Sequence, residues 1–343
     1  MQVTFIDDSI PFDGYSPSSQ PLDGPEKSFA LLPPSLSMRG HDVVVINRAA
    51  FPVTVHGSRW VGWEGEKPVS ADALIAYRKP ELLDQVPVAG RRLVWVGGPV
   101  ADLETSVARE ALTRHKPRLV FISQAQREAW NNTLGLDTLV IEPGLATSYL
   151  EDDAMAPAEP PHAITTAHPL GGLLWLVRLW MARIRPEVPS AELHVYSAAL
   201  DKAQLGGTVP GEYAAMVEEM TVARNHGIVV KRPQADPGMA EAYRAARAHL
   251  HPAEPRDVHG FTVAESQATG LPAVARAASA VMVERIADGQ TGTIAANNAA
   301  FASAAINLLT DRLTFDRMSA NARLLKRGRT WAIAASEWEG QLA

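Results

Sequence analysis

The sequence predicts an α/β protein built from two doubly wound domains. The chain has 343 residues, more than one domain usually holds, so two domains are expected. It opens with a strand–helix–strand pattern, with apolar strands at 3–6 and 43–46 around a helical pattern at 29–39. A proline-rich, acidic stretch at 151–161 lacks periodicity, which indicates a linker between two such domains.

Both halves of the chain continue this alternation of strands and helices. In the first half, further buried strands are expected at 73–76, 93–96, 119–122 and 140–141. In the second half, strands are expected at 163–166, 192–196, 228–230 and 248–252, with helices at 173–185 and 213–220. A last helical pattern runs from Trp331 to Leu342. The segment 13–27 is expected to be a long loop, rich in Pro, Ser and Gly.

Composition excludes several classes of protein. The chain is 46% hydrophobic and 20% charged, which is typical of a soluble globular protein. Its formal net charge of −6, without a basic block, argues against nucleic acid as a partner. The chain has no cysteine, so disulfides, cysteine zinc sites and thiol nucleophiles are excluded. The start lacks a signal-peptide pattern, and the longest apolar run, 170–180, is shorter than the about 20 residues that span a bilayer. We expect a cytoplasmic protein without integral membrane association.

One stretch, 248–272, carries the clearest chemistry. Gly260 lacks a Cβ, so it can adopt a positive φ and let backbone amides approach a ligand. A helix is expected to begin near Thr262, and the free amides at its start suit a phosphate. Glu265 can accept two hydrogen bonds from the vicinal diol of a ribose, each contributing roughly 1.5–3 kcal/mol. Asp257 precedes it by eight residues, so two carboxylates converge on one cleft, where sugar hydroxyls are natural ligands.

Four pieces of sequence follow one another here in a fixed order and spacing. They are an acid-x7-Glu pattern from Asp257 to Glu265, ESQATGLPAV from Glu265 to Val274, Glu284, and DGQTG from Asp288 to Gly292. This series resembles the retaining glycosyltransferases of family 4. A lone glycine loop would be weak evidence, whereas a series over about forty residues is fairly specific.

The resemblance implies the GT-B fold, in which two Rossmann-like domains face each other across a cleft. Residues 1–155 would form the acceptor-binding domain, and residues 156–328 would bind the nucleotide sugar. Residues 329–343 resemble the final helix of this fold, which packs back on the first domain. Domain closure would exclude water and limit hydrolysis of the donor.

The resemblance also assigns roles to individual residues. Asp257 would bind sugar hydroxyls as positive charge grows at the anomeric carbon, and the departing diphosphate would serve as the base for the incoming hydroxyl. The expected catalytic group is Asp257, His259, Gly260 and Phe261. The residues expected to bind the donor nucleotide are Glu265, Thr262, Val263, Lys231, Arg232, Gly171, Gly172 and Gly24. Acceptor contacts are expected at strand ends of the first domain, from Tyr77, Arg78, Gly97 and Gly98.

Three positions depart from the family pattern. Gly97-Gly98 stand where many members have a histidine that helps to position the donor sugar. Gly171-Gly172 stand where members have a Lys or Arg for the diphosphate, so helix-start amides, with charge from Lys231 or Arg232, would take over. Asp257 replaces the usual Glu, and its carboxylate reaches about 1.5 Å less far.

Several of these residues also fit purely structural or solvent-exposed roles. Asp257 also fits a loop acid facing water, and the basic pairs Arg78-Lys79 and Lys231-Arg232 also fit solvated turns. His249 and His251 fall on one face of a strand, but no third ligand follows closely, so hydrogen-bonded strand histidines are favoured over a metal pair. The sequence has no Asp-x-Asp, GxxxxGK[ST], GxGxxG or GxSxG motif. No metal or other cofactor is therefore expected.

The predicted function is glycosyl transfer from a nucleoside-diphosphate sugar, with UDP or dTDP favoured, to a small soluble acceptor. The Ala- and Arg-rich composition resembles that of high-GC actinobacterial proteins, in which such enzymes often decorate antibiotics, so an oligosaccharide antibiotic of the avilamycin kind is one candidate acceptor. Two alternatives remain. A sugar-nucleotide epimerase would turn over the donor without an acceptor, and a non-catalytic sugar-binding module would bind nucleotide without transfer.

Overall fold

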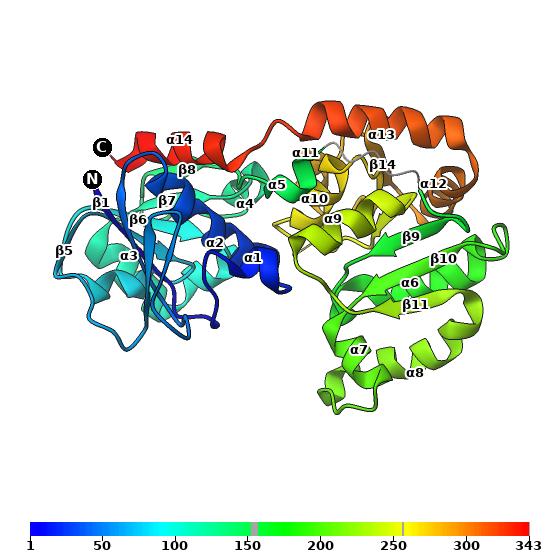
Figure 1. The fold of residues 1–343 in the computed structure, drawn as a ribbon, viewed down its shortest axis with the longest axis horizontal. Helices are drawn as coiled ribbons and strands as arrows, with labels where there is room; N and C mark the ends of the chain where they lie inside the picture. The colour runs from blue at the N-terminus through cyan, green and yellow to red at the C-terminus, as the bar shows by residue number, and fades with distance from the viewer. Residues whose placement is uncertain (152–156, 256, 343) are drawn as a thin grey trace. The chain divides into compact units, whose positions relative to one another are not determined.

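The computed structural model describes residues 1–151, 157–255 and 257–342, and it divides into two compact units (Figure 1). The first unit comprises Met1–Ala146 and Arg329–Ala343, and the second comprises Thr147–Gly328. The domain boundary expected at 155–156 lies outside the described residues, as does part of the expected linker. The two α/β units bear out the predicted fold class.

The first unit is built on an eight-stranded sheet in the order β3-β4-β2-β1-β5-β6-β7-β8. Neighbouring strands are parallel except β3 and β4, which pair antiparallel at the edge. The strands are β1 (Gln2–Ile6), β2 (Asp42–Asn47), β3 (Val53–Val55), β4 (Ser58–Gly62), β5 (Ser70–Tyr77), β6 (Val88–Val96), β7 (Arg118–Phe121) and β8 (Thr138–Val140). Every strand expected here is present. The β3–β4 hairpin was not predicted, because its short segments contain too few apolar residues to show a period.

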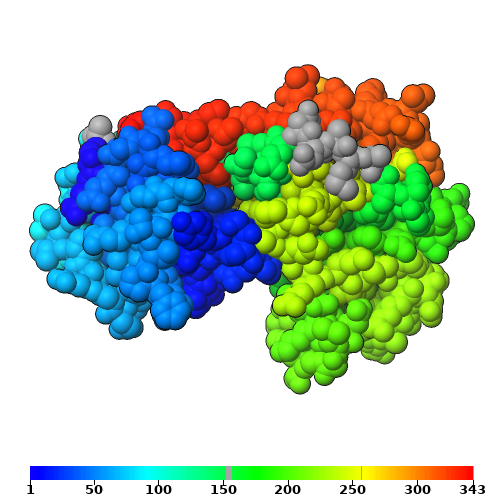
Figure 2. Space-filling model, viewed as in Figure 1, coloured from blue at the N-terminus to red at the C-terminus, as the bar shows by residue number. Residues whose placement is uncertain are grey.

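Helices cover this sheet, and the last of them comes from the chain's end. The helices are α1 (Ser16–Ser19), α2 (Gly24–Ser37), α3 (Ser106–His115), α4 (Gln124–Glu128) and α14 (Trp331–Leu342), with short 3-10 turns at Pro80–Gln85 and Val100–Glu104. Trp338 of α14 is buried against Trp95, with ring centroids 5.1 Å apart. In Figure 2 the red C-terminal residues accordingly lie beside blue residues of the first unit.

The segment 13–27 was expected to be a long loop, but it contains two helical stretches. The structure places the short helix α1 inside it and begins α2 at Gly24, so Lys27 lies in the first helical turn. Pro25 at the second position of α2 pre-sets a helical φ and needs no amide donor, which explains why a helix begins in a proline-rich segment.

The second unit contains a six-stranded, all-parallel sheet in the order β11-β10-β9-β12-β13-β14. The strands are β9 (His162–Thr165), β10 (Glu192–Tyr196), β11 (Ile228–Lys231), β12 (Ala248–His251), β13 (Ala273–Arg276) and β14 (Gly292–Ala295). After β9, the chain adds β10 and β11 on one side of it, and then returns to add β12, β13 and β14 on the other side. Ligands of such sheets bind beyond the carboxyl ends of the strands where the order reverses, which here means β9 and β12.

Helices pack on both faces of this second sheet. They are α5 (Thr147–Leu150), α6 (Leu174–Leu179), α7 (Ala198–Gln204), α8 (Ala214–Ala223), α9 (Asp236–Ala245), α10 (Phe261–Ala268), α11 (Ala280–Arg285), α12 (Asn298–Thr310) and α13 (Arg312–Lys326), with 3-10 turns at Gly211–Tyr213 and Arg224–His226. The helix expected at 173–185 is present, because α6 continues directly into wider π-type turns at Trp180–Ile184, and the kink lies before it, at Gly171 and Gly172. Trp180 is fully buried in the core with Leu193 and Val195. No helix in the described part of the chain is long and apolar enough to cross a membrane.

Candidate functional site

A pocket of about 500 Å³ lies at the reversal point of the second sheet. Loops that follow β9 and β12 form its walls, so it lies at the carboxyl ends of the two strands where a ligand is expected. Its lining residues are Thr166, Ala167, His168, Leu170, Gly171, His251, Ala253, Glu254 and Asp257. Tertiary structure thus brings the expected Asp257 and Gly171 into one pocket.

Asp257 is held by a histidine of the neighbouring strand. The Nε2 of His251, the last residue of β12, donates to Oδ2 of Asp257 over 2.6 Å. The Asp257 backbone is fixed as well, since Ser279 Oγ donates to its carbonyl over 2.7 Å. Burial raises the pKa of the Asp257 carboxyl, but the His251 hydrogen bond and the charges of His251 and His259 outweigh it, so this pKa lies below its usual value. Asp257 is therefore an ionised, oriented carboxylate in the pocket.

The start of α10 depends on a glycine. Gly260 has φ +58°, in the left-handed region, and is the residue directly before the helix. A Cβ at Gly260 would lie 2.9 Å from Met282 Cε and 3.0 Å from Arg285 Cγ, so a larger residue would strain the backbone and force these two side chains to shift. His259 and Phe261 flank it with stacked rings, 5.3 Å apart and inclined by 19°. Close approach of the backbone is therefore built into the helix start, as expected for anion binding.

Further along α10, Glu265 is buried, with 6% of its surface exposed. Thr262 is half-buried and Val263 fully buried in the same helix. Burial raises the pKa of the Tyr243 hydroxyl in α9, and the negative charge of Glu265 raises it further. The same two causes, in the same order, raise the pKa of Tyr149. Glu265 thus lies among aromatic rings behind the helix start, where a charge-assisted hydrogen bond to a ligand is poorly screened by water.

The Gly171–Gly172 turn follows β9 on the other wall of the pocket. Gly172 has φ +79°, and a Cβ on it would lie 3.0 Å from Pro252 Cβ. His168, at the start of this turn, accepts a hydrogen bond from the Leu170 amide at Nδ1 over 3.2 Å. The turn can therefore pass close to β12 only because it carries no side chain.

Lys231 and Arg232 do not line the pocket. They follow β11, the edge strand, and β10 lies between β11 and β9. Neighbouring strands are about 4.8 Å apart, so the end of β11 is about 10 Å from the end of β9. Lys231 is half-buried and Arg232 is exposed. Their role in donor binding stays a prediction.

The residues expected to contact the acceptor lie together in the first unit, at the ends of β5 and β6. Tyr77 is buried and donates from its hydroxyl to the Pro25 carbonyl over 2.7 Å. Its ring covers Gly97, where a Cβ would fall 2.2 Å from the ring. Arg78 has φ +65° and pairs with Glu26 in the first turn of α2, which Gly24 begins. Gly98 is buried too, and its carbonyl accepts from Gln126 Nε2 over 2.7 Å. Tyr77 and Gly97 thus have packing roles. The four acceptor assignments, and the assignment of Gly24 to the donor nucleotide, stay predictions.

Sequence reasoning gave no functional role to His251. Its interpretation as a hydrogen-bonded strand histidine is confirmed, but the partner is the expected catalytic Asp257. His249 is fully buried and bonds Ser266 Oγ through Nδ1 over 2.8 Å. Within the described ranges, no group of three His, Cys, Asp or Glu side chains is placed to hold a metal ion. His251 could have been found from its place at a strand end beside the acid loop.

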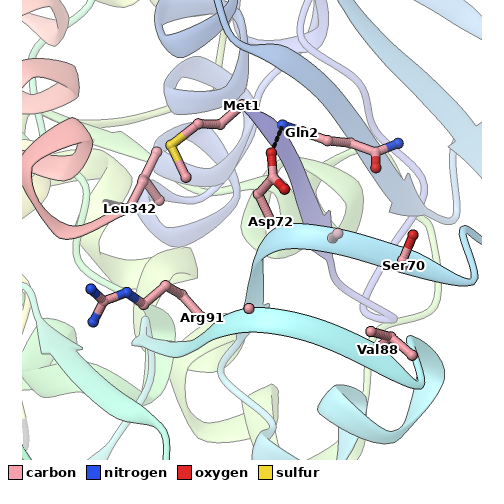
Figure 3. A pocket seen from close by; sticks show the side chains of 9 residues that line it. Met1, Gln2, Ser70, Asp72, Val88, Arg91 and Leu342 are labelled. Atoms are coloured by element: carbon pink, nitrogen blue, oxygen red, sulfur yellow. Dashed lines mark hydrogen bonds between the residues drawn. The ribbon is translucent and has the colours of Figure 1, made fainter.

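A second hollow, of about 660 Å³, lies in the first unit (Figure 3). Gln2, Ser70 and Val88, which begin β1, β5 and β6, contribute to its wall, and the Gln2 amide donates to Asp72 Oδ2 over 2.7 Å. This hollow is at the amino ends of parallel strands, opposite to the edge where ligands of such sheets bind. The pocket of the second unit is therefore the better candidate for a ligand site.

Residues 164–311 match the family model described as glycosyl transferases group 1. This match runs from the second half of β9 to the end of α12 and includes all the residues that line the pocket. No curated protein matches the sequence.

Solved structures of glycosyltransferases share the fold over nearly the whole chain. Sucrose-phosphate synthase from Thermosynechococcus elongatus superposes with a TM-score of 0.74 at 14% identity, covering 99% of this chain and 98% of that chain. Anabaena Alr3699/HepE, in complex with UDP and glucose, gives 0.69 at 14% identity, covering 100% and 99%. AviGT4, a glycosyltransferase involved in avilamycin A biosynthesis, gives 0.62 at 12% identity, covering 100% and 97%. These similarities confirm the predicted GT-B fold.

Proposed function

We propose that this protein is a retaining glycosyltransferase of family 4 type. It would transfer a sugar from a nucleoside diphosphate, with UDP or dTDP favoured, to a small soluble acceptor in the cytoplasm, without a metal. The observation that carries the proposal is the pocket at the reversal of the second sheet, which an ionised carboxylate, Asp257, and a glycine of the turn after β9, Gly171, both line. The match to glycosyl transferases group 1 over these residues supports the reaction class.

Each part of the donor has a counterpart in the second unit. Glu265 would accept hydrogen bonds from the ribose hydroxyls, and the amides that follow Gly260 would face the diphosphate. Asp257, oriented by His251, would bind sugar hydroxyls and stabilise the positive charge that develops at the anomeric carbon. The leaving diphosphate would take the proton of the acceptor hydroxyl on the same face, so the configuration is retained.

The nucleotide site is tested first by calorimetric titration with UDP, dTDP and GDP, without added metal. We expect one nucleotide to bind, and Glu265→Ala to weaken that binding by about tenfold or more, because one charge-assisted bond is worth about 1.5–3 kcal/mol. Glu212→Ala is the matched control, since this carboxylate is exposed on the 3-10 turn before α8. If no nucleotide binds, or Glu265→Ala binds as well as wild type, the donor site is refuted.

Turnover assays then separate transfer from other chemistry. Incubation with the matching nucleotide sugar, with and without saccharide acceptors, is followed by release of nucleoside diphosphate and by NMR of the anomeric proton. An oligosaccharide antibiotic of the avilamycin kind is the first acceptor to test, given that AviGT4 shares the fold. Donor conversion without an acceptor would indicate an epimerase, and binding without any conversion would indicate a non-catalytic module.

A further inference from the structure

Arg276 is a cation near the pocket, and the proposed function gives it no role. It ends β13, the strand next to β12, and is half-buried. Its guanidinium lies over the ring of Trp175 in α6, 4.6 Å from the centroid, and its Nη1 donates a long hydrogen bond of 3.4 Å to the Pro252 carbonyl. Across the described ranges, no carboxylate forms an ion pair with Arg276. Its charge is therefore held in place without being neutralised.

This guanidinium lies close to the Gly171–Gly172 turn. The Pro252 carbonyl oxygen that accepts from Arg276 is also 3.3 Å from the position a Cβ would take at Gly172. Pro252 directly follows His251, which lines the pocket, and Gly171 lines the opposite wall. Arg276 and the glycine turn are thus both next to the Pro252 carbonyl oxygen.

The contacts around Arg276 favour a role in charge recognition. Trp175 is itself fixed, because its Nε1 donates to Asn298 Oδ1 over 3.2 Å and its ring packs edge-on against Phe301. Stacking on an indole leaves the edge of a guanidinium, with its N–H groups, free to bind an anion. A carbonyl bond of 3.4 Å is weak, so a better acceptor can replace it at little cost. A phosphate is the anion that suits such a planar fork.

We infer that Arg276 binds the diphosphate of the donor and supplies the positive charge that the Gly171–Gly172 turn lacks. The inference rests on the proposed function and identifies which group of this chain compensates for the missing Lys or Arg. Arg276 is nearer to the pocket than Lys231 and Arg232, which the sequence offered for this charge. The end of β13 is one strand from β12, whereas the end of β11 is separated from β9 by β10.

The test compares ligands that differ only in phosphate. Calorimetry with Arg276→Gln would use UDP or dTDP, whichever the wild-type protein binds, and the matching phosphate-free nucleoside. We expect the variant to bind the diphosphate about tenfold or more weakly, with nucleoside affinity unchanged. Arg276→Lys should recover part of the loss, because it keeps the charge and loses the fork. Arg178→Gln in α6 is the control, because Arg178 is exposed and pairs with Glu219.

Each outcome decides between the alternatives. Equal binding of the diphosphate by Arg276→Gln and wild type would overturn the inference and leave the proposed function standing. An equal loss of diphosphate and nucleoside would also overturn it, since the effect would then be structural. A wild-type protein that binds no nucleotide would refute the proposed function, and the inference with it.

Discussion

The hydrogen bond between His251 and Asp257 yields the sharpest prediction about catalysis. The two side chains are 12% and 24% exposed, and the bond is 2.6 Å long. A hydrogen bond to a charged group contributes about 1.5–3 kcal/mol, which converts to a factor of about 10 to 150. His251→Gln removes the imidazole and leaves at most a neutral amide donor at this position. We therefore expect kcat/KM for donor turnover to fall by one to two orders of magnitude, with nucleotide affinity changed less than threefold.

The pH profile separates this role from a general loss of packing. His251 lowers the pKa of Asp257, so removing the imidazole should raise that pKa. The acid limb of the kcat/KM profile would then move to higher pH in His251→Gln. His115→Gln is the matched control, because His115 bonds Asp84 over 2.7 Å in the first unit, far along the chain from the pocket residues.

A double-mutant cycle completes the test. If His251 acts through Asp257, the effects of His251→Gln and Asp257→Asn on kcat/KM should be strongly non-additive. The double variant should then be about as active as the less active of the two single variants. Full additivity, together with an unshifted acid limb, would refute the positioning role. Thermal unfolding of each variant would show whether the second unit is intact.

Two further predictions concern stability. Gly260→Ala should lower the free energy of unfolding by about 1–3 kcal/mol, because left-handed strain costs about 1–2 kcal/mol and the Met282 and Arg285 side chains must shift to admit the methyl group, which adds up to about 1 kcal/mol. Urea unfolding followed by tryptophan fluorescence would measure this. Gly289→Ala is the control, with φ +71° and nothing within 4 Å of its Cβ position, and an equal loss in both variants would contradict the steric argument. Stability should also decline as the pH falls from about 6.5 to about 4.5. Burial lowers the pKa of His162 to about 4 and that of His249 to about 3, so in this window the unfolded chain binds protons that the folded chain does not. The slope is at most about 1.4 kcal/mol per pH unit for each histidine. Stability that is constant between pH 7 and 5 would disprove this, and His162→Phe should flatten the slope.

Much of the fold was predictable from local patterns. Buried parallel strands are short apolar runs, so β1, β2, β5, β7 and β10 were located from composition alone. The start of α2 was less predictable, because this helix begins within a proline-rich segment. The edge hairpin was not predicted, since β4 depends on pairing with β2, and β3 on pairing with β4, more than on their own apolar content.

The sequence by itself determined the two-domain α/β class and the acid-x7-Glu segment, since both follow from residue types at short spacing. Tertiary structure alone decided which side chains meet at the pocket. Residues near Gly171 and Asp257 are far apart in the chain, and only the return of the chain from β11 to β12 places their loops side by side. The same sheet order brings Arg276 to Pro252 and leaves Lys231 at the edge strand. Strand order depends on long-range packing, which no local pattern in the sequence encodes.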